Sequence, residues 1–257
     1  KRYSEPGNSM DTKKTIAMFA VLCLIALGLG YWVGQPKKGS GKENAGNPEG
    51  SKEGIKNEAV PKDPDFIKKG LVAYFPFNGN AKDESGNGHH GEAKGATLTA
   101  DRHGQAEQAY NFDGVDDIIT VPSIQALDGA GLTLSAWVNP VSFNTDHYPH
   151  IIGGSKLAFY GKGPAYKEDQ GRIGFWLADS DPLLQSRPIP LKEWSHVVVI
   201  SNGAKTLLYW NGQLDDVTTK NVGVLEISNL EIGSRINRNV GYNEWLGQLD
   251  DVRIYNR

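Results

Sequence analysis

From residue 70 onward, hydrophobic and polar residues alternate in short runs that are separated by turn-forming residues. The alternation is clearest at residues 132–138 (LTLSAWV), and residues 71–77 (LVAYFPF) form an apolar and aromatic run that also predicts a strand. A period of two is typical of β-strands with one buried face, and no stretch after residue 70 sustains the 3.6-residue period of an amphipathic helix. Further strands are expected at 109–112, 118–121, 151–154, 172–177, 194–200, 207–210, 230–234 and 245–256. Such closely spaced short strands predict an all-β, antiparallel two-sheet sandwich or jelly roll over residues 70–257.

The last of these strands, Trp245–Asn256, contains two adjacent carboxylates, Asp250 and Asp251. Neighbouring side chains on a regular strand point to opposite faces, so at least one of the two is expected on a packed face. A buried carboxylate needs a cation, an arginine or backbone N–H groups as its partner. The sequence therefore predicts that Asp250 is held by a bound metal ion, with an ion pair to Arg253 or Arg235 as the alternative.

A hairpin is indicated at Asn211-Gly212, which lies between the runs LLYW and QLDDV. Asn-Gly between alternating apolar residues is the strongest short-range hairpin signal, because both residues tolerate a positive φ. Residues 78–95 are rich in glycine, asparagine and aspartate and are expected to form a long loop.

The N-terminal part has a different composition. Residues 15–34 (TIAMFAVLCLIALGLGYWVG) contain no charged residue, and as a helix they would span about 30 Å of hydrocarbon. The sequence thus predicts a transmembrane helix or signal anchor at 15–34, after an N-terminal flank at 1–14. A cleaved signal peptide is the alternative, but no Ala-x-Ala site follows the run. Basic residues flank it on both sides, with a slight excess before it, which favours a cytoplasmic N-terminus and an extracytoplasmic jelly roll.

Residues 35–69 are dominated by Lys, Glu, Gly, Asn and Pro, which predicts a flexible polar linker. Basic residues outnumber acidic ones up to residue 69, and the balance reverses in residues 70–257. An acidic folded part argues against nucleic acid as a partner. The single cysteine, Cys23, excludes a disulfide within the chain.

Several motifs after residue 70 resemble the laminin-G-like (LamG), concanavalin-A-like jelly-roll family that is common in bacterial surface proteins. The resemblance rests on GLVAYFPF at 70–77, DESGNGHHG at 83–91, FDGVDDI at 112–118, LTLSAWV at 132–138 and GQLDDVRIYNR at 247–257. It implies two curved sheets with the first and last strands adjacent. It also implies a structural calcium ion between the opening strands and the closing one.

Calcium prefers oxygen ligands from carboxylates, amides and backbone carbonyls. The loop at 83–91 offers Asp83 and Asn87, which would lie near Asp250 if the terminal strands pair. An equally weighted alternative for Asp83 is a turn-forming aspartate that caps its own loop. For the cluster Asp113, Asp116 and Asp117, we expect Asp113 to shape the turn at Gly114 and Asp117 to accept backbone N–H bonds; metal binding there is the less favoured alternative.

The same fold occurs in glycoside hydrolases, where a retaining mechanism needs two carboxyl groups about 5–5.5 Å apart. Asp179 and Asp181 have a suitable spacing but stand next to Pro182 in an expected loop. No Ser-His-Asp arrangement is indicated, and His196 is expected to be a structural histidine. The sequence therefore favours a non-catalytic domain.

Binding is the better hypothesis, since sugars are recognised by aromatic faces together with amides and charged groups. The candidate ligand-binding residues are Tyr160, Trp176, Arg238, Asn239, Tyr242 and Asn243. The sequence thus predicts a membrane-anchored domain that recognises carbohydrate, or a protein ligand, at the cell surface. The alternatives are the sensory or scaffolding ectodomain of a larger membrane protein and, less favoured, a glycoside hydrolase.

Overall fold

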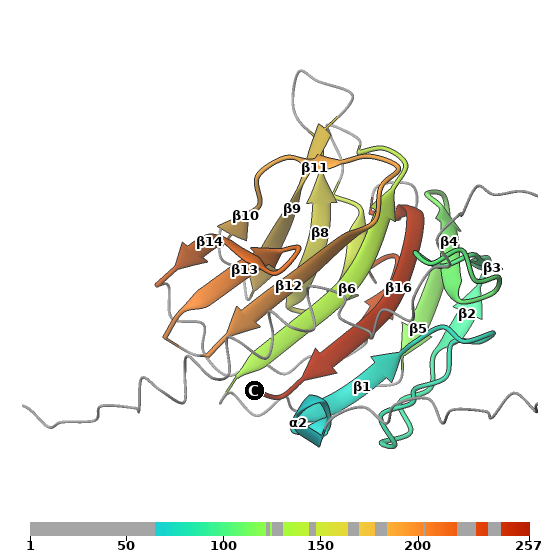
Figure 1. Ribbon diagram of the computed structural model, residues 1–257, viewed down its shortest axis with the longest axis horizontal. Coiled ribbons are helices and arrows are strands. Elements are labelled where there is room, and N and C mark those ends of the chain that lie inside the picture. The colour runs from blue at the N-terminus through green and yellow to red at the C-terminus, as the bar shows by residue number, and fades with distance from the viewer. Residues whose placement is uncertain are drawn as a thin grey trace, which may run out of the picture.

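The computed structural model describes residues 65–121, 124, 131–143, 148–163, 170–177, 184–202, 204–219, 230–235 and 243–257. These ranges form two antiparallel β-sheets, which confirms the predicted all-β sandwich (Figure 1). The predicted transmembrane segment at 15–34, its flank and most of the predicted linker lie outside the described residues. Among the described residues, no helix has the length and apolar character that a membrane span requires.

The first sheet, sheet A, contains the closing strand. Its order is β14 (Gln213–Thr218), β13 (Thr206–Trp210), β12 (Ser195–Ser201), β6 (Leu132–Pro140), β16 (Leu246–Tyr255), β4 (Ala109–Asp113) and β3 (Thr97–Thr99). The opening strand, β1 (Leu71–Phe75), also pairs with β16. The first and last strands are therefore adjacent, as predicted.

Sheet B lies against sheet A. Its order is β10 (Leu184–Gln185), β9 (Gln170–Leu177), β8 (Leu157–Lys162), β7 (His150–Gly154), β15 (Leu230–Ile232), β5 (Ile118–Val121) and β2 (Glu92–Lys94), and β11 (Ile189–Pro190) also pairs with β9. The core between the sheets takes alternate residues from both of them, for example Leu134, Val199 and Val252 from sheet A and Phe159 and Phe175 from sheet B.

Strand β16 holds sheet A together. One of its edges pairs with β6 at residues 247–250 and again at 253–255. Residues 246–249 also pair with β4, and residues 252–255 pair with β1. Figure 1 shows the C-terminus beside the start of β1, where the Asn256 N–H donates to the Gly70 carbonyl. Segments from opposite ends of the domain thus meet on one strand.

Some elements differ from the prediction. Strands β2 and β3 were not predicted; they are three residues long and largely exposed, so they carry little apolar signal. Strand β8 was also missed; its sequence LAFYGK begins with a short apolar run and does not alternate. The predicted linker ends too late, because Asp65–Lys68 forms one helical turn (α2) and the Phe66 carbonyl accepts a hydrogen bond from Arg257.

Candidate functional site

The adjacent carboxylates of β16 do not point to opposite faces, so that prediction was wrong. Both contact one guanidinium group: Arg102 Nη1 lies 2.5 Å from Asp250 Oδ2, and Arg102 Nη2 lies 2.7 Å from Asp251 Oδ2. The cause is a β-bulge, because the register with β6 shifts between Asp250 and Arg253, and Asp251 has a φ of 51°. The bulge lies where the second edge of β16 changes its partner from β4 to β1.

Two further donors contact Asp251. The Tyr74 hydroxyl donates to Asp251 Oδ1 over 2.7 Å, and Arg253 Nη2 lies 3.1 Å from the same oxygen. The guanidinium of Arg253 lies 4.1 Å above the Tyr74 ring, and that of Arg102 lies 4.8 Å above the Trp137 ring. Asp250 thus forms an ion pair, as the alternative predicted, but with Arg102; Arg253 pairs with Asp251.

The two carboxyl groups differ in their acidity. Burial, and then the charge of Asp251, raises the pKa of Asp250, and Arg102 opposes this rise. Burial would also raise the pKa of Asp251, but Arg253, Arg102 and the Tyr74 hydroxyl outweigh it, so that pKa is lowered. Asp251 is thus the more strongly ionised member of the pair.

A buried histidine lies in the same row of sheet A. His196 pairs in register with Trp137, which pairs with Asp250 on its other side. The Nε2 atom of His196 lies 2.9 Å from Ser135 Oγ, and both side chains are almost fully buried. Burial, followed by Arg253, lowers the pKa of His196 to about 3. A neutral, buried imidazole that is hydrogen-bonded to Ser135 fits the structural role predicted for His196.

Asp83 lies in the loop after β1 and organises that loop. Its carboxylate accepts backbone N–H bonds from Tyr74 (2.9 Å), Ser85 (2.8 Å) and His89 (2.9 Å). The Ser85 hydroxyl donates to it as well. Burial would raise the pKa of Asp83, but these donors together lower it. Asn87 donates from its amide to the Leu71 and Val72 carbonyls and so fixes the loop to β1.

These contacts do not fit the expected calcium site. A calcium ion needs oxygens that turn their lone pairs toward it. The Asp83 oxygens instead face N–H and O–H donors, Asp250 faces Arg102, and Asn87 presents its NH₂ group to backbone carbonyls. Calcium binding by this chain stays a prediction, but Asp83, Asn87 and Asp250 do not form its ligand set here.

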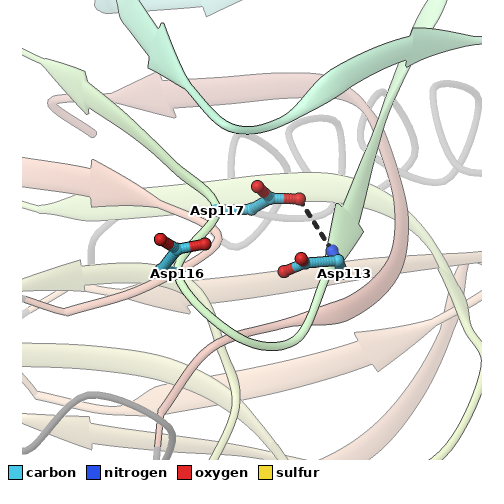
Figure 2. A group of neighbouring side chains, drawn as sticks. All are labelled: Asp113, Asp116 and Asp117. Carbon is cyan, nitrogen blue, oxygen red and sulfur yellow. Dashed lines mark hydrogen bonds between the residues drawn. The ribbon is translucent and has the colours of Figure 1, made fainter.

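The second acidic cluster shapes the turn between β4 and β5. Figure 2 shows Asp113, Asp116 and Asp117 around this turn, with the Asp117 carboxylate accepting the Asp113 N–H over 2.8 Å. Asp113 accepts the Val115 N–H over 2.8 Å, and Gly114 has a φ of 76°. The carboxylate oxygens lie within 4.8 Å of one another, yet Asp113 and Asp116 are exposed. The turn-forming roles predicted for Asp113 and Asp117 are confirmed.

The face of sheet B that points away from the core brings together two predicted ligand-binding residues. In β9, Ile173 and Phe175 point into the core, so Arg172, Gly174 and Trp176 lie on the outer face. The Arg235 guanidinium lies 4.7 Å above the Trp176 ring, and its Nε donates to the Gly154 carbonyl. Gly153 leaves room for this arrangement, because a Cβ there would lie 2.6 Å from Arg235 Cβ.

Tyr160 lies on the same face in the next row. Its ring crosses Gly174, where an added Cβ would come within 2.5 Å of Tyr160 Cζ. Tyr148 packs edge-on against it at 5.3 Å between ring centroids, and the Lys162 ammonium lies 5.3 Å from the Tyr148 centroid. Burial raises the pKa of Tyr160 to about 12, so its hydroxyl stays protonated. Tyr160 is almost fully buried, whereas Tyr148 is 42% exposed, so Tyr148 offers the accessible ring.

The other predicted ligand-binding residues stand close together in the sequence, at 238–243. Arg238, Asn239 and Tyr242 lie outside the described residues. Asn243 is described and partly buried, and its carbonyl accepts the His150 N–H over 2.8 Å. This contact joins Asn243 to β7 at His150, whose ring lies 6.1 Å from that of Tyr160.

Acidic residues that stand close together in the sequence bind other groups of the protein where the structure describes them. Asp179 and Asp181 lie outside the described residues. Asp215 binds the backbone N–H and guanidinium of Arg187, and Asp216 accepts the Gln185 N–H. Asp250 and Asp251 are 2% and 9% exposed and are held by arginines.

Comparison with known protein families places the fold in context. The model of the "Concanavalin A-like lectin/glucanases superfamily" matches residues 113–257, which is more than half of the chain. The chain belongs to this superfamily. Because the family name joins lectins and glucanases, membership alone does not separate binding from hydrolysis. A search of the curated proteins finds no match.

Solved structures show the same fold at low sequence identity. Domain 4 of the extracellular arabinanase AbnA from Geobacillus stearothermophilus, solved with arabinotriose, is 20% identical with a TM-score of 0.53; the alignment covers 72% of this chain and 91% of that one. Trypanosoma rangeli sialidase in complex with sialic acid is 15% identical with a TM-score of 0.55, covering 96% of this chain and 37% of that one. The binding domain of botulinum neurotoxin serotype D is 15% identical with a TM-score of 0.51, covering 74% and 49%.

Arg102 and Tyr74 are the important residues that sequence reasoning missed. Arg102 stands in a short polar turn, and its two partners are about 150 positions away along the chain. Only knowledge of which strands meet would have identified it. Tyr74 alternates with core residues of β1, so its position facing away from the core could be expected, but its acceptor could not.

Proposed function

We propose that this chain is a non-catalytic carbohydrate-recognition module whose ligand-binding surface is the outer face of sheet B. The observation that carries the proposal is the partly buried Trp176, which lies on this face beneath the Arg235 guanidinium and away from the core. An accessible aromatic ring beside hydrogen-bond donors is the combination that binds a sugar ring and its hydroxyl groups. Membership of a superfamily that includes lectins supports this proposal.

The surface has a second aromatic position. Tyr148 is exposed, its orientation is fixed by Tyr160, and Lys162 lies beside its ring. Tyr148 and Trp176 belong to different rows of the same face, which suits an oligosaccharide better than a single sugar.

We also propose that the module is tethered to a membrane and faces outward. The uncharged run at 15–34 and the polar stretch at 35–64 support an anchor followed by a spacer. Protease treatment of intact cells tests this: cleavage in the stretch 35–64 should release the module into the medium. Its retention after complete digestion of a surface control protein would contradict an outward orientation.

The test of recognition is a glycan array probed with the full chain, followed by calorimetric titration of the best ligand. Trp176→Ala should weaken binding by about tenfold or more, because a desolvated aromatic contact contributes on the order of 1–3 kcal/mol. Trp210→Ala is the matched control, since Trp210 is also partly buried and also lies near a guanidinium, that of Arg187 at 5.4 Å, but belongs to sheet A.

The two variants make the outcome decisive. Melting temperatures measured in parallel show whether either protein is misfolded. Selective loss of affinity in the folded Trp176→Ala protein supports the proposed surface. Equal loss in both variants, or no glycan bound by the wild-type chain, would count against it.

A further inference from the structure

The cluster around Asp250 and Asp251 disagrees with the calcium site that the sequence and the family resemblance led us to expect. We propose that the Arg102 guanidinium takes the place of a divalent cation at this point, so that β16 closes the sandwich without calcium. This inference concerns how the fold is closed and does not depend on the proposed carbohydrate binding.

The first argument is the way in which Arg102 is bound. Arg102 contacts the two adjacent carboxylates of β16 with one Nη atom for each, as a cation bound between them would. A guanidinium offers its N–H groups in a planar fork, which suits contacts with two oxygen atoms. The bulge at Asp251 makes this geometry possible, because it turns the second carboxylate toward the same side as the first.

The second argument is charge balance. Two carboxylates face two guanidinium groups, those of Arg102 and Arg253, and the Tyr74 hydroxyl supplies one more donor. Both oxygens of Asp251 and one of Asp250 are occupied by these donors. A calcium ion would add two positive charges to a neutral cluster and would have to displace Arg102.

The third argument is that contacts other than those with the carboxylates also position Arg102. Asp101, its neighbour, accepts the N–H groups of His103 (2.9 Å) and Gln105 (2.7 Å) and so fixes the turn between β3 and β4. The Trp137 ring supports the guanidinium from β6. The arginine thereby ties the β3–β4 turn to β16 and β6, which is the connection expected of a structural ion.

The experiment measures thermal melting of the full chain in excess calcium chloride and in EDTA. The wild-type melting temperature should be the same in both. Arg102→Ala should melt roughly 10 °C lower in EDTA, because it leaves buried carboxylates without their main partner. Calcium should then restore part of the loss, since the vacated position lies between two carboxylates. If this variant is unfolded in EDTA, recovery of cooperative melting after refolding in calcium is the same readout.

Two further variants locate the effect. Arg187→Ala is the matched control: it removes an arginine that also pairs with an aspartate, Asp215, and lies near a tryptophan, and its melting should be independent of calcium. Asp250→Asn in the wild-type background tests for an ion at β16. A calcium-dependent rise in the wild type that disappears in Asp250→Asn would overturn the proposal, as would an Arg102→Ala protein that does not respond to calcium. A wild-type rise that persists in Asp250→Asn places the ion elsewhere and leaves the proposal standing.

Discussion

At the scale of single residues, the buried carboxylates are stabilised by different kinds of donor. Asp83 relies on backbone N–H groups from its own loop and from β1, whereas Asp250 relies on a guanidinium from a distant turn. The local partners of Asp83 could be anticipated, because an aspartate that begins a glycine-rich loop commonly caps it. The partner of Asp250 could not be anticipated, because the alternation of residues in β16 does not predict a bulge at Asp251.

His196 should make the stability of the protein depend on pH. Its pKa lies near 3 in the folded protein, below the ordinary value of 6.5, because the site disfavours a charged ring. Its contribution to stability is therefore complete above about pH 6.5 and is lost as the pH falls toward 3. The loss should be on the order of a few kcal/mol, and chemical denaturation at several pH values measures it.

The variant His196→Gln provides the comparison. Glutamine can still hydrogen-bond Ser135 but does not titrate, so the variant should be less stable at pH 7 and should lose less stability between pH 6.5 and 4. Protonation of Asp83, whose pKa is lowered, acts at more acidic pH, below its ordinary value of 3.8, and affects both proteins alike. Parallel pH profiles for wild type and variant would show that His196 is not responsible.

At the scale of elements, strands with a strong apolar alternation were predictable and the short polar ones were not. The predicted strand at 118–121 coincides with β5, and 207–210 differs from β13 by one residue. Strands β2 and β3 exist because they hydrogen-bond to β5 and β4, respectively, so their sequence alone gives no sign of them. The Asn211-Gly212 hairpin was predicted and is confirmed, with Trp210 opposite Gln213.

The contribution of this hairpin to stability can be tested by substitution. Asn211 has a φ of 46°, and its side-chain oxygen accepts the His196 N–H over 2.7 Å. Asn211→Ala should lower the free energy of unfolding by about 1–3 kcal/mol, because alanine loses the hydrogen bond and disfavours a positive φ. Asn211→Gly separates the two effects, since glycine loses only the hydrogen bond and should be the milder change. Denaturant titration would contradict this account if glycine were as harmful as alanine.

For the molecule as a whole, one neighbour of the closing strand was predicted, but its other neighbours and the way in which it is held were not. Adjacent first and last strands followed from the family resemblance, and the pairing of β1 with β16 confirms them. Of the candidate ligand-binding residues, Tyr160 is buried and packs against the exposed Tyr148, while Trp176 lies beside the Arg235 guanidinium. Which aromatic side chains are accessible depends on strand register and on glycines such as Gly174, and neither is visible in the spacing of aromatic residues.

The family match begins at residue 113, but the fold described here does not. Residues 65–112 supply β1, β2, β3 and most of β4, and both β1 and β4 pair with the same edge of β16. They also supply Phe75, Phe77 and Phe112 to the core and carry Arg102. We therefore expect a fragment of residues 113–257 not to fold by itself, because it exposes that edge of β16 and leaves Asp250 without its arginine.

Circular dichroism melting of residues 65–257 and 113–257 checks this expectation. The longer fragment should melt cooperatively, and the shorter one should show no transition and should bind a hydrophobic dye. Adding residues 65–112 as a separate peptide should restore a transition, because its missing contacts are non-covalent. The same peptide with Arg102→Ala should restore it less well, which would connect the assembly of the whole domain to the one guanidinium at its closing strand. A cooperative transition in 113–257 alone, near the melting temperature of the longer fragment, would contradict this expectation. It would mean that the fold does not require the opening strands.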